Sequence, residues 1–148
     1  MPGIKRDVAV LVDTGPIVSV FDENDPDHDI CIETMRAIRC PLITVWPVIT
    51  EAMHLLSRSS QVQDRLWELI VRGSLRLSEL TTENVQRMRQ LMRKYSDLPM
   101  ALADAALVSV AERENLRTIF TLDRDFGVYA PSHLRSFRIL PPLRHVIS

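Results

Sequence analysis

Cysteine is scarce in this sequence of 148 residues, which contains two, Cys31 and Cys40. Their number and spacing match neither a zinc site nor a redox pair. We therefore interpret both as small apolar side chains of a protein in a reducing compartment, the cytoplasm.

Long apolar runs are also missing. Residues 8–12 form a continuous apolar run of five residues, and no other uncharged apolar stretch is long enough to suggest a membrane segment. A membrane span needs about 20 apolar residues, and a signal peptide also needs a longer apolar region. The sequence therefore predicts no membrane partner.

An excess of positive charge is absent as well, because the formal net charge is -1 at pH 7. No global basic field therefore points to a nucleic-acid partner. The basic residues are 2 lysines and 16 arginines. Arginine suits bidentate contact with phosphate, but a genomic composition bias explains heavy arginine use equally simply, and we favour the bias.

Short apolar runs alternate with amphipathic segments along the chain. Strands are expected over residues 8–12, 42–45, 75–77, 118–122 and 137–140. Helices are expected from residue 16 onward and over residues 26–39, 47–56, 61–71, 82–95 and 98–115. This alternation predicts one α/β domain with a four- or five-stranded, mostly parallel sheet and a core of about residues 8–140.

Residues 98–111 are apolar apart from Asp104, the only charge in the run. A helix that is apolar on every face is normally buried, which places the Asp104 carboxylate inside the protein. Such a carboxylate must be protonated, ion-paired or bound to a cation. A core aspartate bonded to backbone amides or to a distant arginine is the alternative. Asp97, just before Pro99, is expected to cap this helix.

Three further acids are placed where ligands bind in open α/β sheets, beyond the carboxyl ends of the strands. Asp13 follows the first strand, and Asp123 follows the strand over residues 118–122. Taken singly, each is better explained as a turn or helix cap. Glu51 lies beside the apolar face of its helix, where the helix macrodipole also explains an acid.

Taken together, the four acids suit a hard cation. They have no matching cluster of histidine, lysine or cysteine, so they make a poor ion-pair network. Oxygen-only ligands favour Mg²⁺ or Mn²⁺ over zinc. A bound cation offsets both the burial and the mutual repulsion of the carboxylates. Trp46 and Trp67, by contrast, are typical of a core or an interface.

These residues, in this order, resemble the PIN-domain ribonucleases, and in particular the VapC-type toxins of bacterial toxin–antitoxin pairs. The similar motifs lie at residues 12–15, 44–51, 95–106 and 121–126. The resemblance extends over residues 8–140. It implies a single three-layer α/β/α PIN-like nuclease domain over residues 1–148.

The resemblance implies four catalytic and metal-binding residues, Asp13, Glu51, Asp104 and Asp123. It also implies three supporting residues, Thr14, Thr121 and Asp125. Asp13 and Asp104 are the best candidates for direct contact with Mg²⁺ or Mn²⁺. Gly15 stands where many relatives have serine, which leaves the carboxylates intact.

The implied activity is hydrolysis of RNA phosphodiester bonds with one or two divalent ions. Glu51 and Asp123 are both open as the general base. The amides that open the helix after residues 14–15 are a candidate phosphate site, and Arg124 is a candidate contact to the RNA backbone. Single-stranded or looped RNA fits best. The family also implies a homodimer and a small antitoxin that occludes the site.

Other functions remain open or are disfavoured by missing residues. A housekeeping RNA-processing nuclease and a catalytically silent PIN-fold binding module are the alternatives to a toxin. A phospho-accepting receiver needs a lysine after a late strand, and neither Lys5 nor Lys94 is suitably placed. A phosphatase of the haloacid dehalogenase type needs a second acid where Gly15 stands.

Overall fold

Five parallel strands form one sheet in the order β3-β2-β1-β4-β5. The strands are β1 (Val10–Val12), β2 (Leu42–Thr44), β3 (Leu75–Leu77), β4 (Thr118–Phe120) and β5 (Arg138–Leu140). The structure is a computed structural model that describes residues 7–142. The predicted sheet is confirmed as five-stranded and entirely parallel. The ends of the predicted domain, residues 1–6 and 143–148, lie outside the described residues.

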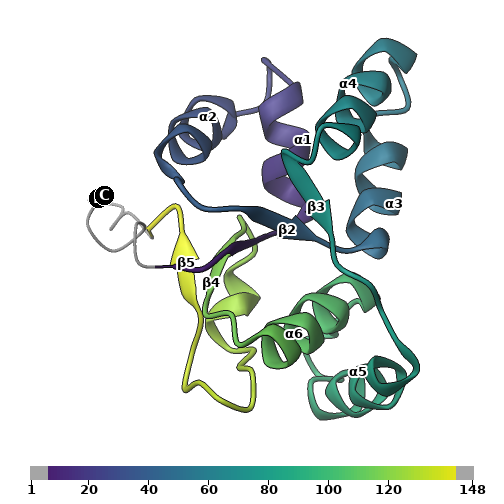
Figure 1. Ribbon diagram of the computed structural model, residues 1–148, viewed down its shortest axis with the longest axis vertical. Helices are drawn as coiled ribbons and strands as arrows, with labels where there is room; N and C mark the ends of the chain where they lie inside the picture. Colours follow the sequence, from purple (N-terminus) through teal and green to yellow (C-terminus); the bar gives the residue numbers. More distant parts are fainter. Residues whose placement is uncertain (1–6, 143–148) are drawn as a thin grey trace.

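Helices cover both faces of the sheet (Figure 1), which confirms the three-layer α/β/α architecture. One layer holds α1 (Thr14–Phe21), α2 (His28–Ala37), α3 (Trp46–Leu55) and α4 (Ser60–Val71). The other layer holds α5 (Thr82–Lys94) and α6 (Leu102–Glu114). Within the described residues, no helix has the length and apolar character that crossing a membrane requires.

Strand β3 has the predicted bounds, and the other four strands are shorter than the apolar runs that predicted them. Val8 lies in a bend and is 83% exposed, and the first strand begins at Val10. Val45 is buried and extended, but it is already the N-cap of α3. Strand β1 is central, and all its residues and those of β4 are buried, as expected for strands covered on both faces.

Helix α6 is buried on every face, as its apolar sequence predicts. The expected cap is wrong, however. The helix begins at Leu102 with Ala101 as N-cap, and the Ala101 N–H donates to Oδ2 of Asp104 at 3.1 Å. Asp97 lies exposed in the preceding loop. Asp104 therefore satisfies a free amide of its own helix, because an acid in the first turn can reach back to the N-cap.

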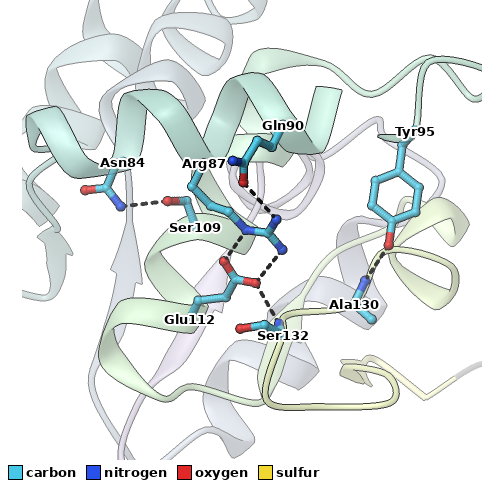
Figure 2. Close-up of polar contacts among 8 residues, drawn as sticks. All are labelled: Asn84, Arg87, Gln90, Tyr95, Ser109, Glu112, Ala130 and Ser132. Atoms are coloured by element: carbon cyan, nitrogen blue, oxygen red, sulfur yellow. Dashed lines mark hydrogen bonds and ion pairs between the residues drawn. The ribbon is translucent and has the colours of Figure 1, made fainter. Parts of the chain in front are cut away.

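Polar contacts fix α6 to α5 and to the loop after η2 (Arg124–Gly127), as Figure 2 shows. Nε and Nη2 of Arg87 donate to the two carboxylate oxygens of Glu112 at 2.7 and 2.9 Å. The Ser132 N–H donates to the same carboxylate at 2.6 Å, and Nδ2 of Asn84 donates to Oγ of Ser109 at 2.6 Å. These contacts hold in place the helix that carries Asp104.

We expect Glu112→Gln to lower the free energy of unfolding by about 1–3 kcal/mol, because it leaves the Arg87 guanidinium with a neutral partner. Urea denaturation measures the change. The matched control is Glu68→Gln, since Glu68 is exposed on α4, and its effect should stay within about 0.5 kcal/mol. Equal losses in the two variants would contradict a structural role for the Arg87–Glu112 pair.

Candidate functional site

The carboxyl ends of β1 and β4 meet where the strand order reverses, since β2 lies on one side of β1 and β4 on the other. Ligands bind at such switch points in open α/β sheets. Asp13 directly follows β1, and its N–H donates to the Phe120 carbonyl at 2.9 Å. Asp123 follows β4, and Asp104 comes from the first turn of α6.

Three carboxylates converge at this edge. Oxygen atoms of Asp13, Asp104 and Asp123 all lie within 4.8 Å of one another. Asp13 and Asp104 are buried, and Asp123 is half-buried. The structure thus brings together three of the four acids that the sequence singled out.

Two threonines hold the Asp13 carboxylate in place. Oγ1 of Thr121 donates to Oδ2 of Asp13 at 2.8 Å, and the Thr14 N–H donates to Oδ1 at 2.8 Å. Oγ1 of Thr121 also accepts from the Asp123 N–H at 3.0 Å, so one buried hydroxyl contacts both strand ends. The Thr14 amide therefore serves Asp13 and is not a free donor for a phosphate.

Glu51, the fourth acid, lies outside the group of three. It is exposed on α3, and its Oε2 accepts a hydrogen bond from Oγ1 of Thr14 at 2.9 Å. Thr14 therefore contacts Asp13 through its backbone and Glu51 through its side chain. This contact places Glu51 beside the cluster without making it a member.

Asp125 and Arg124 follow Asp123 in η2. The Asp125 N–H donates to Oδ1 of Asp123 at 2.9 Å, so Asp125 supports the cluster through its backbone. Its own side chain is half-buried, and Arg124 is exposed.

Burial and repulsion both act against charge in the cluster. Burial, then the negative charge of Asp13, raises the pKa of Asp104 to about 7, and Asp123 and Glu51 add to this rise. Burial also raises the pKa of Asp13, although its hydrogen bonds from Thr121 and Thr14 oppose the rise. Burial and repulsion therefore disfavour the charged forms of Asp13 and Asp104 unless positive charge is supplied.

Asp7, which the sequence analysis did not single out, is a buried acid with cationic partners at the amino edge of the sheet. Its carboxylate is buried, and it lies 3.3 Å from Nε of Arg117 and 3.6 Å from Nη1 of Arg138. Oγ1 of Thr118 donates to it at 2.8 Å. Asp7 has cationic partners, whereas within residues 7–142 no salt bridge reaches Asp13, Asp104 or Asp123.

The donor set of the cluster fits a hard divalent cation. All its ligand atoms are carboxylate oxygens, which Mg²⁺ and Mn²⁺ prefer to nitrogen or sulfur. A cation there offsets the desolvation and repulsion that raise the pKa values of Asp13 and Asp104.

Sequence reasoning missed Tyr129, a buried residue within the electrostatic field of the same carboxylates. No motif or spacing marks it, since it follows η2 in a segment without periodicity. Only the tertiary packing of this segment against the loop before α6 reveals it.

A family model for the PIN domain matches residues 10–130. The chain belongs to the PIN domain family. Ribonuclease VapC26 of Mycobacterium tuberculosis is 28% identical over 135 residues, which cover 89% of this chain and 100% of the relative. The family assignment agrees with the motif resemblance, and the acidic cluster lies within the matched residues.

Solved structures share the PIN fold of this chain. The crystal structure of VapC20, a sarcin-ricin loop cleaving toxin of M. tuberculosis, matches with a TM-score of 0.76 and 16% identity, covering 85% of this chain and 98% of that one. VapBC2 from Rickettsia felis, in a crystal structure with a DNA fragment from the VapBC2 promoter, matches with a TM-score of 0.60 and 14% identity. The match covers 88% of this chain and 96% of that one. At these identities the likeness is one of fold.

We expect Asp104→Asn to stabilise this PIN domain near pH 7.5 in the absence of divalent cations, by up to about 4 kcal/mol. The ordinary aspartate pKa of 3.8 rises to about 7 on folding, so between these values the folded state keeps a proton that the unfolded state has lost. The stability of the wild type therefore falls as pH rises through this interval, and asparagine removes that fall.

Denaturation in EDTA at pH 4 and pH 7.5 measures this difference. The gain of Asp104→Asn should shrink toward pH 4, where the unfolded wild type regains part of its proton and the folded wild type stays protonated. Asp97→Asn is the matched control, because Asp97 is exposed, and its profile should parallel the wild type. A constant offset between Asp104→Asn and wild type at both pH values would contradict the raised pKa of Asp104.

Proposed function

We propose that this PIN domain is a divalent-cation-dependent ribonuclease that hydrolyses RNA phosphodiester bonds, and that it is the toxin of a type II toxin–antitoxin pair. The convergence of oxygens from Asp13, Asp104 and Asp123 within 4.8 Å carries the proposal. The relative VapC26, named a ribonuclease, supports the activity.

Asp13, Asp104 and Asp123 hold the cation, Mg²⁺ or Mn²⁺. When bound, a divalent cation supplies a Lewis acid that stabilises charge on phosphoryl oxygens and makes water a better nucleophile. Thr121 and Thr14 orient the Asp13 carboxylate through the hydrogen bonds described above. Asp125 orients the Asp123 carboxylate through its N–H.

Glu51 is the general base in this proposal. Its Oε2 is held by the Thr14 hydroxyl, while its Oε1 accepts no hydrogen bond from the described residues and can take the proton of the attacking water. Glu51 is suited to this role because it lies beside the three ligands rather than among them. Asp123, the other candidate, belongs to the cation-binding group.

The RNA strand reaches the site through the bound cation, because the carboxylates themselves repel phosphate. Single-stranded or looped RNA, whose backbone can bend into the site, suits this approach. Arg124, exposed on η2 next to Asp123, provides a contact to the RNA backbone.

A homodimer and a small antitoxin that occludes the site are the protein partners in this proposal. Exposed apolar side chains on α3 and α4 support it, since such groups mark interaction surfaces. These side chains are Trp46, Leu55, Trp67 and Val71. Trp46 and Trp67 are 50% and 44% exposed, and their ring centroids are 6.2 Å apart. The expectation of a core environment for these tryptophans is therefore wrong.

We place the toxin–antitoxin pair in the cytoplasm, where the free cysteines stay reduced.

We expect Asp104→Asn to reduce Mn²⁺-dependent cleavage of RNA by at least about 100-fold, because a ligand of the cation is lost. Cleavage of a single-stranded RNA pool, followed on a denaturing gel, measures the rate. In parallel, Mn²⁺ should raise the melting temperature of the wild type more than that of the variant, by ligand linkage.

Two variants sharpen this test. Asp97→Asn, in the exposed loop before α6, should cleave at the wild-type rate. Glu51→Gln should lower kcat by about 10²–10⁴-fold, as expected for loss of a general base, while it keeps the Mn²⁺-induced shift in melting temperature. Cleavage by Asp104→Asn at the wild-type rate would contradict the catalytic proposal. An unchanged kcat in Glu51→Gln would assign the role of general base to Asp123 instead.

The toxin proposal has its own test in a bacterial expression host. Expression of the chain alone should arrest growth, and co-expression of a short upstream reading frame encoding a DNA-binding antitoxin should restore it and yield a stable complex on size-exclusion chromatography. RNA cleavage without growth arrest would assign a housekeeping nuclease instead. Cation binding without cleavage would assign a silent binding module.

A further inference from the structure

Tyr129 packs between the two segments that carry Asp104 and Asp123. Its ring lies edge-on to Tyr95 and to Phe126, with centroid distances of 5.0 and 5.2 Å. The Tyr129 N–H donates to the Asp125 carbonyl at 2.9 Å, which ties it to η2. The Tyr95 carbonyl accepts from the Met100 N–H at 3.2 Å, in the loop that leads into α6.

This packing explains the aromatic ring at position 129 but not its hydroxyl group. The side chain is fully buried, and its hydroxyl has no hydrogen-bond partner among residues 7–142. A buried tyrosine hydroxyl normally has a partner, because leaving it unpaired costs free energy. Phe126 and Phe137 pack in the same aromatic group without a hydroxyl, so a ring alone would satisfy the packing.

The hydroxyl lies in the field of the acidic cluster. Burial raises the pKa of Tyr129 far above its usual range, and the negative charge of Asp104 is the next largest cause. Asp125, Asp123 and Asp13 contribute in the same direction. The hydroxyl therefore keeps its proton and is available as a donor, with Asp104 as the carboxylate that acts on it most strongly.

The Asp104 carboxylate has an acceptor to offer. Its Oδ2 accepts from the Ala101 N–H, whereas its Oδ1 accepts no hydrogen bond from the described residues. One unpaired donor and one unpaired acceptor thus lie on neighbouring segments at the same site.

We propose that Tyr129 is a positioning residue, whose hydroxyl donates a hydrogen bond to the Asp104 carboxylate when a divalent cation occupies the cluster. This inference rests on the proposed function, because it requires that the cluster binds a cation. Carboxylates that bind metal ions are themselves usually hydrogen-bonded, and loss of such a partner typically weakens metal affinity about 10–100-fold.

The test is Tyr129→Phe, which keeps the ring and removes the hydroxyl. We expect Mn²⁺ to bind about 10-fold more weakly by titration calorimetry at pH 7.5. The melting temperature in EDTA should be at least that of the wild type, since an unpaired buried hydroxyl has been removed. In an Asp104→Asn background, Tyr129→Phe should cause no further loss of Mn²⁺ affinity.

Tyr95→Phe is the matched control. The Tyr95 hydroxyl accepts from the Ala130 N–H at 3.4 Å (Figure 2), and its removal should leave the Kd for Mn²⁺ unchanged. A wild-type Kd in Tyr129→Phe would overturn the inference and leave the proposed function standing. Equal weakening in both variants would also overturn it, because loosened aromatic packing would then be the cause. Failure of the wild type to bind Mn²⁺ would overturn both proposals.

Discussion

Asp13 and Asp104 are two negative groups held close together where little water reaches them. Their raised pKa values express the cost of that arrangement, and Asp123 adds a third carboxylate to it. At the other edge of the sheet, Asp7 is equally buried but lies between arginines. The two edges therefore differ in what surrounds a buried carboxylate. Arginines lie beside the acid at the amino edge, whereas within residues 7–142 no salt bridge reaches the three carboxylates at the carboxyl edge.

The rest of the fold keeps the unbalanced carboxylates from moving apart. Hydrogen-bonded β1 and β4 set the separation of Asp13 and Asp123, and the Thr121 hydroxyl contacts both strand ends. Asp104 depends on α6, which packs through apolar residues and is held by the Arg87–Glu112 pair from α5. Favourable packing far from the cluster therefore offsets its electrostatic cost, a common arrangement in functional sites.

The sequence predicted the parallel sheet and a cluster of four acids, of which three converge. Apolar runs that end in aspartate place Asp13 and Asp123 at one sheet edge, and Asp104 stands out as the only charge in an apolar helix. The sequence could not predict which group caps α6, since Asp97 and Asp104 are both near the helix start and the choice depends on where the chain turns. The Thr14 contact of Glu51 and the position of Tyr129 depend on segments distant along the chain. Apolar periodicity carries no information about such contacts.

The three acids differ in the strength of the segments that carry them. Asp104 is followed by seven buried residues in α6, Ala105 to Ala111, whereas Asp123 caps a single turn of 3-10 helix and is half-buried. Local opening in proteins starts where few buried contacts hold a segment, and the backbone amides of η2 should exchange with solvent well before those of α6. We therefore expect the cluster to open from the Asp123 side first. Transient fraying of η2, without any domain motion, would then limit the lifetime of a cation held by the proposed site.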